Sequence, residues 1–229
     1  MKRDTNVGFR VFTTIERPSS AVLKLYEHVE STHVSDAMNR FGGMDLNIRP
    51  ASPEMRVVGP AVTVRTRPGD NLMMYKAIEI ASPGDVIVIE NRGYTTVASW
   101  GDLISMIAKA LGLGGVVTDG GVRDIEGIRR VGFPVFARDW YSPLGAFKDG
   151  PGEVNVPIAC GGVAVLPGDV VVADANGVVV VPKADAEAVG RKAIEIAEGE
   201  KHKIRAMGEG KLIPEWLNQT LKDKGCTIV

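Results

Sequence analysis

Three short runs of apolar, mostly β-branched residues, with helical stretches between them, restrict the fold of this chain more than any other feature. We predict strands at 86–90, 115–118 and 134–137, and helices at 99–111 and 124–131. Continuous apolar runs that are joined by helices are typical of buried parallel strands with right-handed crossovers. The centre of the chain therefore predicts an α/β domain.

The flanking segments extend this sheet and change its character. A strand at 57–66 and a helix that begins at Asp70 precede the central alternation. After about residue 142 the apolar runs are short and separated by Gly, Pro and Asp, so antiparallel strands join the parallel ones. The turn Asp174-Ala175-Asn176-Gly177 favours a hairpin, because Asn-Gly accepts the positive φ of a tight turn. The other predicted strands are at 154–158, 162–166, 169–173 and 177–181. We also predict a polar helix at 183–208 and a helical region at 18–41. In this region Ser19 or Ser20 is the expected cap, and a second helix is expected to start at Ser35-Asp36.

Composition and charge exclude several functional classes. The 229 residues carry a formal net charge of -1 with acids and bases interspersed, so no basic surface for nucleic acid is expected. Cys160 and Cys226 lie far apart and outside any CxxC motif, which favours a reducing compartment. The N-terminus lacks the apolar core of a signal peptide, and no run approaches the roughly 20 apolar residues of a membrane helix. We therefore expect one cytoplasmic domain over residues 1–229 that binds neither nucleic acid nor membranes.

Acidic and basic side chains follow two neighbouring predicted strands. Asp102 falls in the first turn of the helix at 99–111, and Arg123-Asp124 follow the strand at 115–118 after Asp119-Gly120-Gly121. A Gly-rich turn between strand and helix leaves free backbone N–H groups, and open α/β sheets bind ligands at such strand ends. We therefore expect two carboxylates and one guanidinium to meet at one edge of the sheet.

Other interpretations of these and nearby residues stay open. Asp102 and Asp124 are equally suited to be helix caps. Asn71 is expected either to border the pocket or to cap the helix that begins at Asp70. His33 favours a surface or capping role, and His28, His33 and His202 lack the spacing of a zinc site. A Schiff-base lysine is disfavoured, because Lys76 and Lys109 are typical of the water-facing side of a helix.

The spacing of Asp102 and Arg123-Asp124 resembles the signature of the 4-hydroxy-4-methyl-2-oxoglutarate aldolases, which share a fold with the regulator of ribonuclease activity A. The resemblance extends over most of the chain. It includes Val34-Ser35-Asp36-Ala37, Gly59-Pro60-Ala61, Gly120-Gly121-Val122-Arg123-Asp124, Gly168-Asp169 and Asp174-Ala175-Asn176-Gly177. It implies a layered β/β/α sandwich similar to phosphohistidine swivelling domains, assembled as a homotrimer or homohexamer. Subunit contacts would then involve the N-terminal helices and the C-terminal helix and tail, at about 183–229.

The resemblance also implies a class II pyruvate aldolase, with oxaloacetate decarboxylation as a side activity. Cleavage of a 4-hydroxy-2-oxo acid leaves a pyruvate enolate, whose charge Mg²⁺ or Mn²⁺ would stabilise as a Lewis acid. By resemblance Asp124 anchors the cation, and Arg123 binds the substrate carboxylate with the backbone at Gly101, Leu103 and Ile104. Asp102 would hold a metal-bound water for proton transfer. A glutamate of the neighbouring subunit, Glu200 or else Glu198, would complete the site.

A non-catalytic regulator that binds a ribonuclease is the alternative within the same family. The regulator branch lacks the acid that follows the arginine, whereas Asp124 is present here. The sequence therefore favours the enzyme. The residues that would bind the far end of the 2-oxo acid are not marked by any motif.

Overall fold

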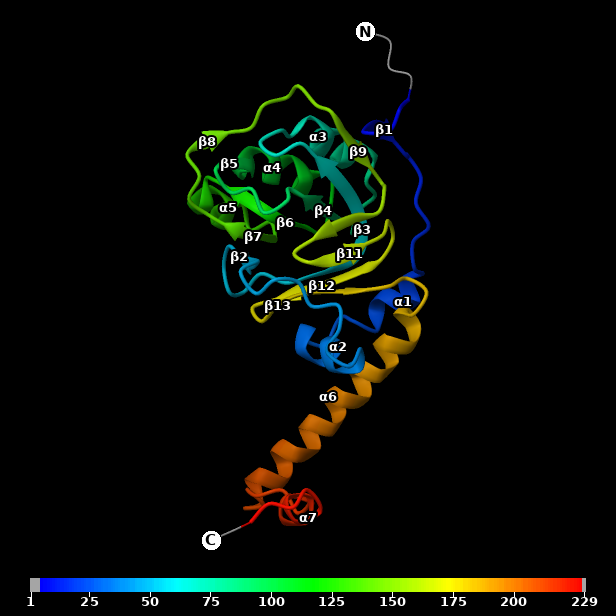
Figure 1. Ribbon diagram of the computed structural model, residues 1–229, viewed down its shortest axis with the longest axis vertical. Helices are drawn as coiled ribbons and strands as arrows, with labels where there is room; N and C mark the ends of the chain where they lie inside the picture. The colour runs from blue at the N-terminus through cyan, green and yellow to red at the C-terminus, as the bar shows by residue number, and fades with distance from the viewer. Residues whose placement is uncertain (1–4, 228–229) are drawn as a thin grey trace.

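The computed structural model describes residues 5–227, and it is organised around one large mixed sheet (Figure 1). The strands β3, β4, β6 and β7 run parallel to one another, and β5 is parallel to β6. Antiparallel strands join this sheet through β12, which pairs with both β3 and β13. The strands are β1 Phe9–Val11, β2 Arg49–Pro50, β3 Val57–Thr66, β4 Val86–Glu90, β5 Val97–Trp100, β6 Gly115–Val122, β7 Val135–Asp139, β8 Leu144–Gly145, β9 Gly152–Val154, β10 Ile158–Cys160, β11 Val163–Val165, β12 Val170–Asp174 and β13 Gly177–Val181. The α/β class with mixed strand directions is confirmed.

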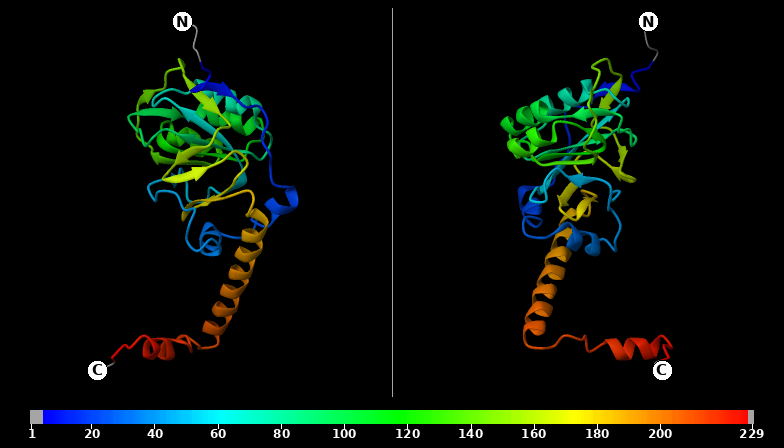
Figure 2. Two further views of the ribbon diagram at one scale, coloured as in Figure 1. Left: turned by 45° about the vertical axis from the view of Figure 1, so that its right-hand side comes forward. Right: turned by 90° about the vertical axis from the view of Figure 1, so that its left-hand side faces the viewer.

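Helices α3, α4 and α5 cover one face of the sheet, as Figure 2 shows from the side. The β10–β11 hairpin packs on the sheet through Ile158, Cys160 and Val165, which belong to the main apolar core. The molecule is therefore layered in space: the helices form one layer, the sheet the next and the β10–β11 hairpin the third. The helices are α1 Ser20–Lys24, α2 Ser31–Ala37, α3 Leu72–Ile80, α4 Asp102–Ala110, α5 Ile125–Val131, α6 Ala186–Gly208 and α7 Leu217–Asp223.

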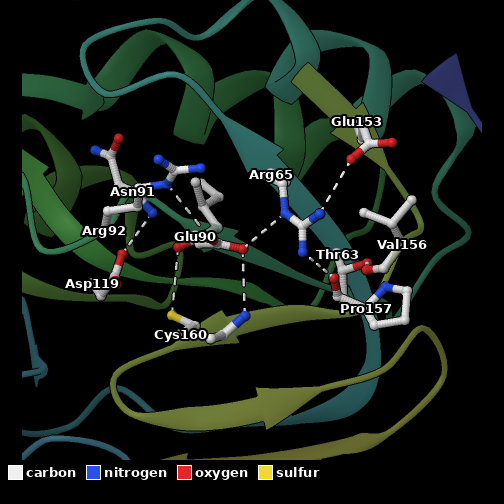
Figure 3. A network of polar contacts seen from close by, with 12 residues as sticks. Thr63, Arg65, Glu90, Asn91, Arg92, Asp119, Glu153, Val156, Pro157 and Cys160 are labelled. Carbon is white, nitrogen blue, oxygen red and sulfur yellow. Dashed lines mark hydrogen bonds and ion pairs between the residues drawn. The ribbon is translucent and has the colours of Figure 1, made fainter. Parts of the chain in front are cut away.

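A partly buried network of charges joins the hairpin to the sheet (Figure 3). The Arg65 guanidinium donates to Glu90 at 3.1 Å, to Glu153 at 3.2 Å and to the carbonyl of Pro157 at 2.6 Å. The Cys160 thiol donates to the Ile89 carbonyl, and burial raises the pKa of this thiol. Cys160 is therefore a small buried residue of the core. Because Arg65 is satisfied within the network, these charges serve to hold the layers together.

A second, smaller core packs α1, α2 and the start of α6 against β12 and β13. Helix α6 buries residues only in its first half, with Ala197 the last of them. Beyond that point the helix leaves the body of the protein and carries α7 at its far end (Figures 1 and 2). Among the described residues, no helix combines the length and the apolar character needed to cross a membrane. Residues 1–4, part of the N-terminus on which the signal-peptide expectation rests, lie outside the described residues.

The helical region expected at 18–41 is two short helices. The Ser19 hydroxyl caps α1 by accepting a hydrogen bond from the Val22 N–H. Ser19 is therefore the cap, of the two serines that were predicted. The second start expected at Ser35-Asp36 is wrong, because α2 begins at Ser31. Glu30 precedes it and forms a reciprocal capping box with His33. His33 therefore has the capping role that its position suggested.

The boundaries around Asp102 and Arg123 also differ from the prediction. Helix α4 begins at Asp102, and the preceding Val97–Trp100 is a strand. Strand β6 continues through Asp119-Gly120-Gly121 to Val122, so the expected Gly-rich turn does not exist. These glycines serve close packing, since a Cβ on Gly120 would collide with Asn91 and one on Gly121 with the Thr95 backbone. The loop after β4 thus lies directly against β6.

Other differences concern the strand expected at 154–158 and the C-terminal region. The strand expected at 154–158 divides into the end of β9 and the start of β10, where Asn155 has a positive φ of 58°. Such a conformation interrupts an extended strand. Helix α7 was not predicted at all.

Candidate active site

A small polar cavity lies where β5 and β6 end and α4 and α5 begin. Its volume is about 110 Å³, which is well below the size of typical drug or cofactor pockets. Six of the residues expected at the site line it: Gly101, Asp102, Leu103, Ile104, Arg123 and Asp124. The cavity is therefore of a size for a small organic acid.

Asp124 adopts a left-handed backbone conformation at the start of α5. Its φ and ψ are 59° and 38°, a region that costs energy for residues other than glycine but that aspartate tolerates. One carboxylate oxygen, Oδ2, lies only 2.7 Å from where a Cβ on Gly101 would stand. The same oxygen is 3.3 Å from Nε of Arg123, and both side chains are almost half exposed. The Asp124 carboxylate is thus available to a ligand.

Glycines make room for each of the three charged side chains. Besides Gly101 under Asp124, Gly127 of α5 lies against the carboxylate of Asp102. Gly145 lies under the guanidinium of Arg123, with 2.6 Å between its hypothetical Cβ and Nη1. A side chain at any of these glycines would displace a charge of the cavity.

The first turn of α4 presents backbone donors to the cavity. The first backbone hydrogen bond of this turn runs from the Ser105 N–H to the Gly101 carbonyl. The N–H groups of Leu103 and Ile104 precede it and have no helical acceptor. The turn is held in place because Trp100 Nε1 donates to the Ser105 hydroxyl, which in turn donates to Gly101. Together with the helix dipole, these donors favour a carboxylate at this point.

Asn71 borders the cavity from the start of α3. Its side chain makes no capping hydrogen bond, so the capping alternative is wrong. Instead Nδ2 donates to the carbonyl of Ser99 at 3.4 Å, and the buried Oδ1 has no partner within the described part of the chain. A buried carbonyl oxygen without a donor is costly, so a ligand hydroxyl or a water would stabilise it.

The donor set of the cavity fits a hard divalent cation. The described residues contain no cluster of three or more His, Cys, Asp or Glu side chains suited to a metal. The carboxylates of Asp124 and Asp102 supply oxygen atoms only. Mg²⁺ is commonly bound by one or two carboxylates, with water and substrate oxygens completing the shell. Asp124 would hold such a cation, with Asp102 beside it.

The two glutamates expected from α6 are not at the cavity of their own chain. Glu200 Oε2 lies 2.9 Å from Nε2 of His33. Glu198 pairs with Lys201, and this hydrogen bond lowers the pKa of the Glu198 carboxyl. Their contribution to the site of a neighbouring subunit stays a prediction.

Several residues of the cavity were not predicted from the sequence, among them Tyr75 and Lys148. Tyr75 lies on α3, and Lys148 belongs to the loop between β8 and β9. Neither residue stands in a motif, and Lys148 is far in sequence from the other charged groups. Only the fold brings them to the site.

Comparisons with known proteins agree on one family. A family model described as "RraA-like: Aldolase/RraA" matches residues 31–180. A curated protein of Halalkalibacterium halodurans, named "Putative 4-hydroxy-4-methyl-2-oxoglutarate aldolase", is 41% identical over 80% of this chain and 87% of its own length. A solved structure of an uncharacterized Pseudomonas syringae protein has a TM-score of 0.76 and 31% identity, over 86% of this chain and 96% of that one. The Streptomyces coelicolor protein RraAS2, described as an unusual member of the RNase ES inhibitor RraA family, has a TM-score of 0.73 and 30% identity, over 83% and 98% of the two chains.

Proposed function

The chain belongs to the RraA-like family, and from this premise we propose that it is a divalent-metal-dependent aldolase. Its substrate would be 4-hydroxy-4-methyl-2-oxoglutarate or a related 4-hydroxy-2-oxo acid, and its product pyruvate. The observation that carries the proposal is the convergence of Asp102, Arg123 and Asp124 on one small polar cavity at the start of α4. The name of the Halalkalibacterium halodurans relative supports it.

Arg123 and the start of α4 are suited to the carboxylate next to the keto group. The planar guanidinium can donate two parallel hydrogen bonds to a carboxylate. The N–H groups of Leu103 and Ile104 add donors from the other side of the cavity. The 2-oxo end of the substrate is thereby oriented toward Asp124.

Cleavage of the bond between C3 and C4 develops negative charge on the keto oxygen of the leaving pyruvate. Asp124 would hold a divalent cation, which would supply Lewis-acid stabilisation of that charge. Asp102, which lines the same cavity, would accept the proton of the 4-hydroxyl group, directly or through one water, and would return this proton to C3. The same charge develops when oxaloacetate loses carbon dioxide, so we expect that reaction as a side activity.

A coupled pyruvate assay tests this proposal. We expect pyruvate release from a panel of 4-hydroxy-2-oxo acids and oxaloacetate, abolished by EDTA and restored by Mg²⁺ or Mn²⁺. D124A and R123A should lose activity by about two orders of magnitude or more, with unchanged circular dichroism. R130A is the matched control, because Arg130 is an exposed arginine of α5 outside the cavity. No release from any acid with metal present would refute the proposal, as would a fully active D124A protein.

Assembly into a homotrimer or homohexamer belongs to the same proposal. The cavity is open on the side of Arg123 and Asp124, whose side chains are almost half exposed. Helix α6 projects away from the body of its own chain (Figure 2). A neighbouring copy would bring Glu200, or else Glu198, to this open side.

A regulator that binds a ribonuclease is the second candidate. It is favoured by the likeness to the Streptomyces coelicolor protein, whose description names it a member of an RNase inhibitor family. Tight binding to a ribonuclease, together with no metal-dependent pyruvate release, would establish it. Because the acid that the regulator branch is expected to lack is present as Asp124 and is exposed at the cavity, we favour the enzyme.

A further inference from the structure

Glu200 and His33 form a contact between α6 and α2 that the chemistry above does not use. Helix α6 buries Gly190, Ala193 and Ala197 along one side, and Glu200 continues this stripe one turn further out. The Glu200 side chain therefore faces α2, which lies beside α6 (Figure 1), and its Oε2 is 2.9 Å from Nε2 of His33. The His33 side chain is only 11% exposed, whereas that of Glu200 is half exposed. Glu200 is thus held where α6 leaves the body of the protein.

The hydrogen bonds of His33 determine which ring nitrogen carries the proton. Nδ1 accepts from the Glu30 N–H at 3.0 Å, as part of the capping box at the start of α2. A ring nitrogen that accepts a hydrogen bond carries no proton, so in the neutral ring the proton is on Nε2. Nε2 therefore donates to the carboxylate of Glu200. The backbone of α2 orients the imidazole, and the imidazole in turn orients the carboxylate.

This contact differs from the other ion pairs of α6. The remaining glutamates of the helix pair with flexible cations of the same helix: Glu187 with Arg191, Glu195 with Lys192 and Glu198 with Lys201. Exposed pairs of this kind contribute little energy and do not fix the carboxylate. The buried ring of His33, bonded at both nitrogens, restricts Glu200 to one direction. Within the described part of the chain no group donates to the second oxygen, Oε1, of Glu200.

We propose that His33 is a positioning residue for Glu200, whose free oxygen it presents to the cavity of a neighbouring subunit. This inference rests on the proposed function, in which Glu200 completes a neighbour's site. His33 holds Oε2 and leaves Oε1 for proton transfer there. Functional side chains are commonly supported by such outer hydrogen bonds, because a group that is free to rotate is seldom in the productive direction. His33 acts on the reaction without touching the substrate.

Replacement of His33 in the pyruvate assay tests this role. H33A should lower kcat about tenfold to a hundredfold, which is the usual loss when an outer hydrogen bond is removed, and should change KM less. H33Q should recover part of the rate, because its side-chain amide is again a donor to the carboxylate. S19A is the matched control: it removes the side-chain cap of α1, which packs in the same small core, and should keep kcat while it lowers the urea midpoint.

A double variant separates positioning from a general effect on folding. If His33 acts only through Glu200, H33A should cause no further loss of the residual rate in an E200Q background. Losses that multiply in the double variant would overturn the proposal. It would equally be overturned by wild-type kcat in H33A, or by a fully active E200Q protein.

Nitrogen NMR of the histidine side chains gives a readout that does not depend on turnover. The chain has three histidines, so the signals of His33 are those missing from H33Q. At mildly alkaline pH we expect a neutral ring protonated on Nε2, whose signal shifts in E200Q and stays unchanged in S19A. A ring protonated on Nδ1 would contradict the assignment. A wild type that releases no pyruvate would instead refute the proposed function and the catalytic part of this inference, while the spectra would still decide whether His33 orients Glu200.

Discussion

Asp124 combines an unfavourable backbone conformation with an exposed charge. Its left-handed φ of 59° is stabilised only by its surroundings, among them the hydrogen bond from the Ile128 N–H to its carbonyl. Strain of this kind collects at functional sites, where the surrounding structure holds a side chain in a required direction. At Asp124 the strain directs the carboxylate over Gly101 and into the cavity.

Replacement of Asp124 separates strain from function. D124G removes the strained side chain, so we expect the free energy of unfolding to rise by up to about 1 kcal/mol while metal-dependent activity is lost. D124N keeps the left-handed preference and removes the charge, so it should lose activity with little change in stability. Urea unfolding and the pyruvate assay measure the two effects. A D124G protein that is clearly less stable than the wild type would contradict the strain argument.

Gly127 offers a test of close packing at the site. An alanine in a helix is normally stabilising by about 0.5–1 kcal/mol relative to glycine, but a Cβ at Gly127 would collide with the Asp102 carboxylate. We expect G127A to lower kcat about tenfold or more, because displaced catalytic groups lose rate steeply.

The control for this change is G208A. A Cβ on Gly208 of α6 would meet nothing within 4 Å, so activity should be retained. Equal activity of G127A and wild type would show that Asp102 does not need its present position.

At the scale of elements, the sequence predicts the sheet better than the helix starts. The strands Val57–Thr66 and Val86–Glu90 have the predicted bounds, because continuous β-branched runs between turn residues have few alternatives. The start of α4 and the length of β6 were wrong, since glycines that look like a turn are used for packing against the loop after β4. Short-range patterns do not distinguish these two uses of glycine.

The same contrast applies to the candidate site. Asp102, Arg123 and Asp124 could be placed together, because both segments follow adjacent strands of the parallel sheet. Lys148 could not be, because it reaches the cavity through hydrogen bonds to Asp70, almost eighty residues earlier. Long-range contacts between loops leave no periodic signal in the sequence.

The packing of the loop after β4 on β6 makes the stability of the protein depend on pH. Burial raises the pKa of Asp119 above its ordinary 3.8, although its carboxylate accepts from the N–H groups of Asn91 and Gly93 (Figure 3). The folded chain therefore binds this proton more tightly than the unfolded chain does. Its contribution to stability is present below 3.8 and is lost as the pH rises through the raised pKa.

The D119N variant has no carboxyl group to titrate at this position. The amide oxygen of the new asparagine is a weaker hydrogen-bond acceptor than a carboxylate, so it lowers the stability of the variant by an amount that does not depend on pH. We expect the free energy of unfolding of the wild type to fall relative to D119N as the pH increases from 3.8 towards neutrality. Urea unfolding at a series of pH values measures the difference. A wild type that gains stability relative to D119N over this range would contradict the assignment.

At the scale of the whole molecule, the exposed apolar residues are not scattered evenly. The outer half of α6 and the tail beyond it expose Ile204, Met207, Leu212, Ile213 and Trp216. The outward face of α4 exposes Leu103, Met106, Ile107 and Leu111, and Leu103 borders the cavity. Apolar surfaces of this kind commonly mark contacts between proteins. They support an assembly in which α6 of one copy approaches the cavity of another.

Mixing of two inactive variants tests this assembly. R123A lacks the carboxylate-binding residue and E200Q lacks the glutamate that a neighbour would contribute. If these residues act at one site from different subunits, a refolded equal mixture should regain about a quarter of wild-type activity, because random assembly restores that share of sites. The pyruvate assay measures the recovery. A mixture as inactive as its components would place both residues at the site of one chain, and an E200Q protein with full activity would deny Glu200 a role.

A crystal soaked in Mn²⁺ and pyruvate tests most directly whether Asp124 holds a divalent cation beside Arg123. We predict an anomalous peak within about 2.3 Å of an Asp124 carboxylate oxygen, as for a directly bound divalent cation. The pyruvate carboxylate should lie within hydrogen-bond distance of the Arg123 guanidinium. A cavity without a manganese peak, or pyruvate bound away from Arg123, would contradict the account.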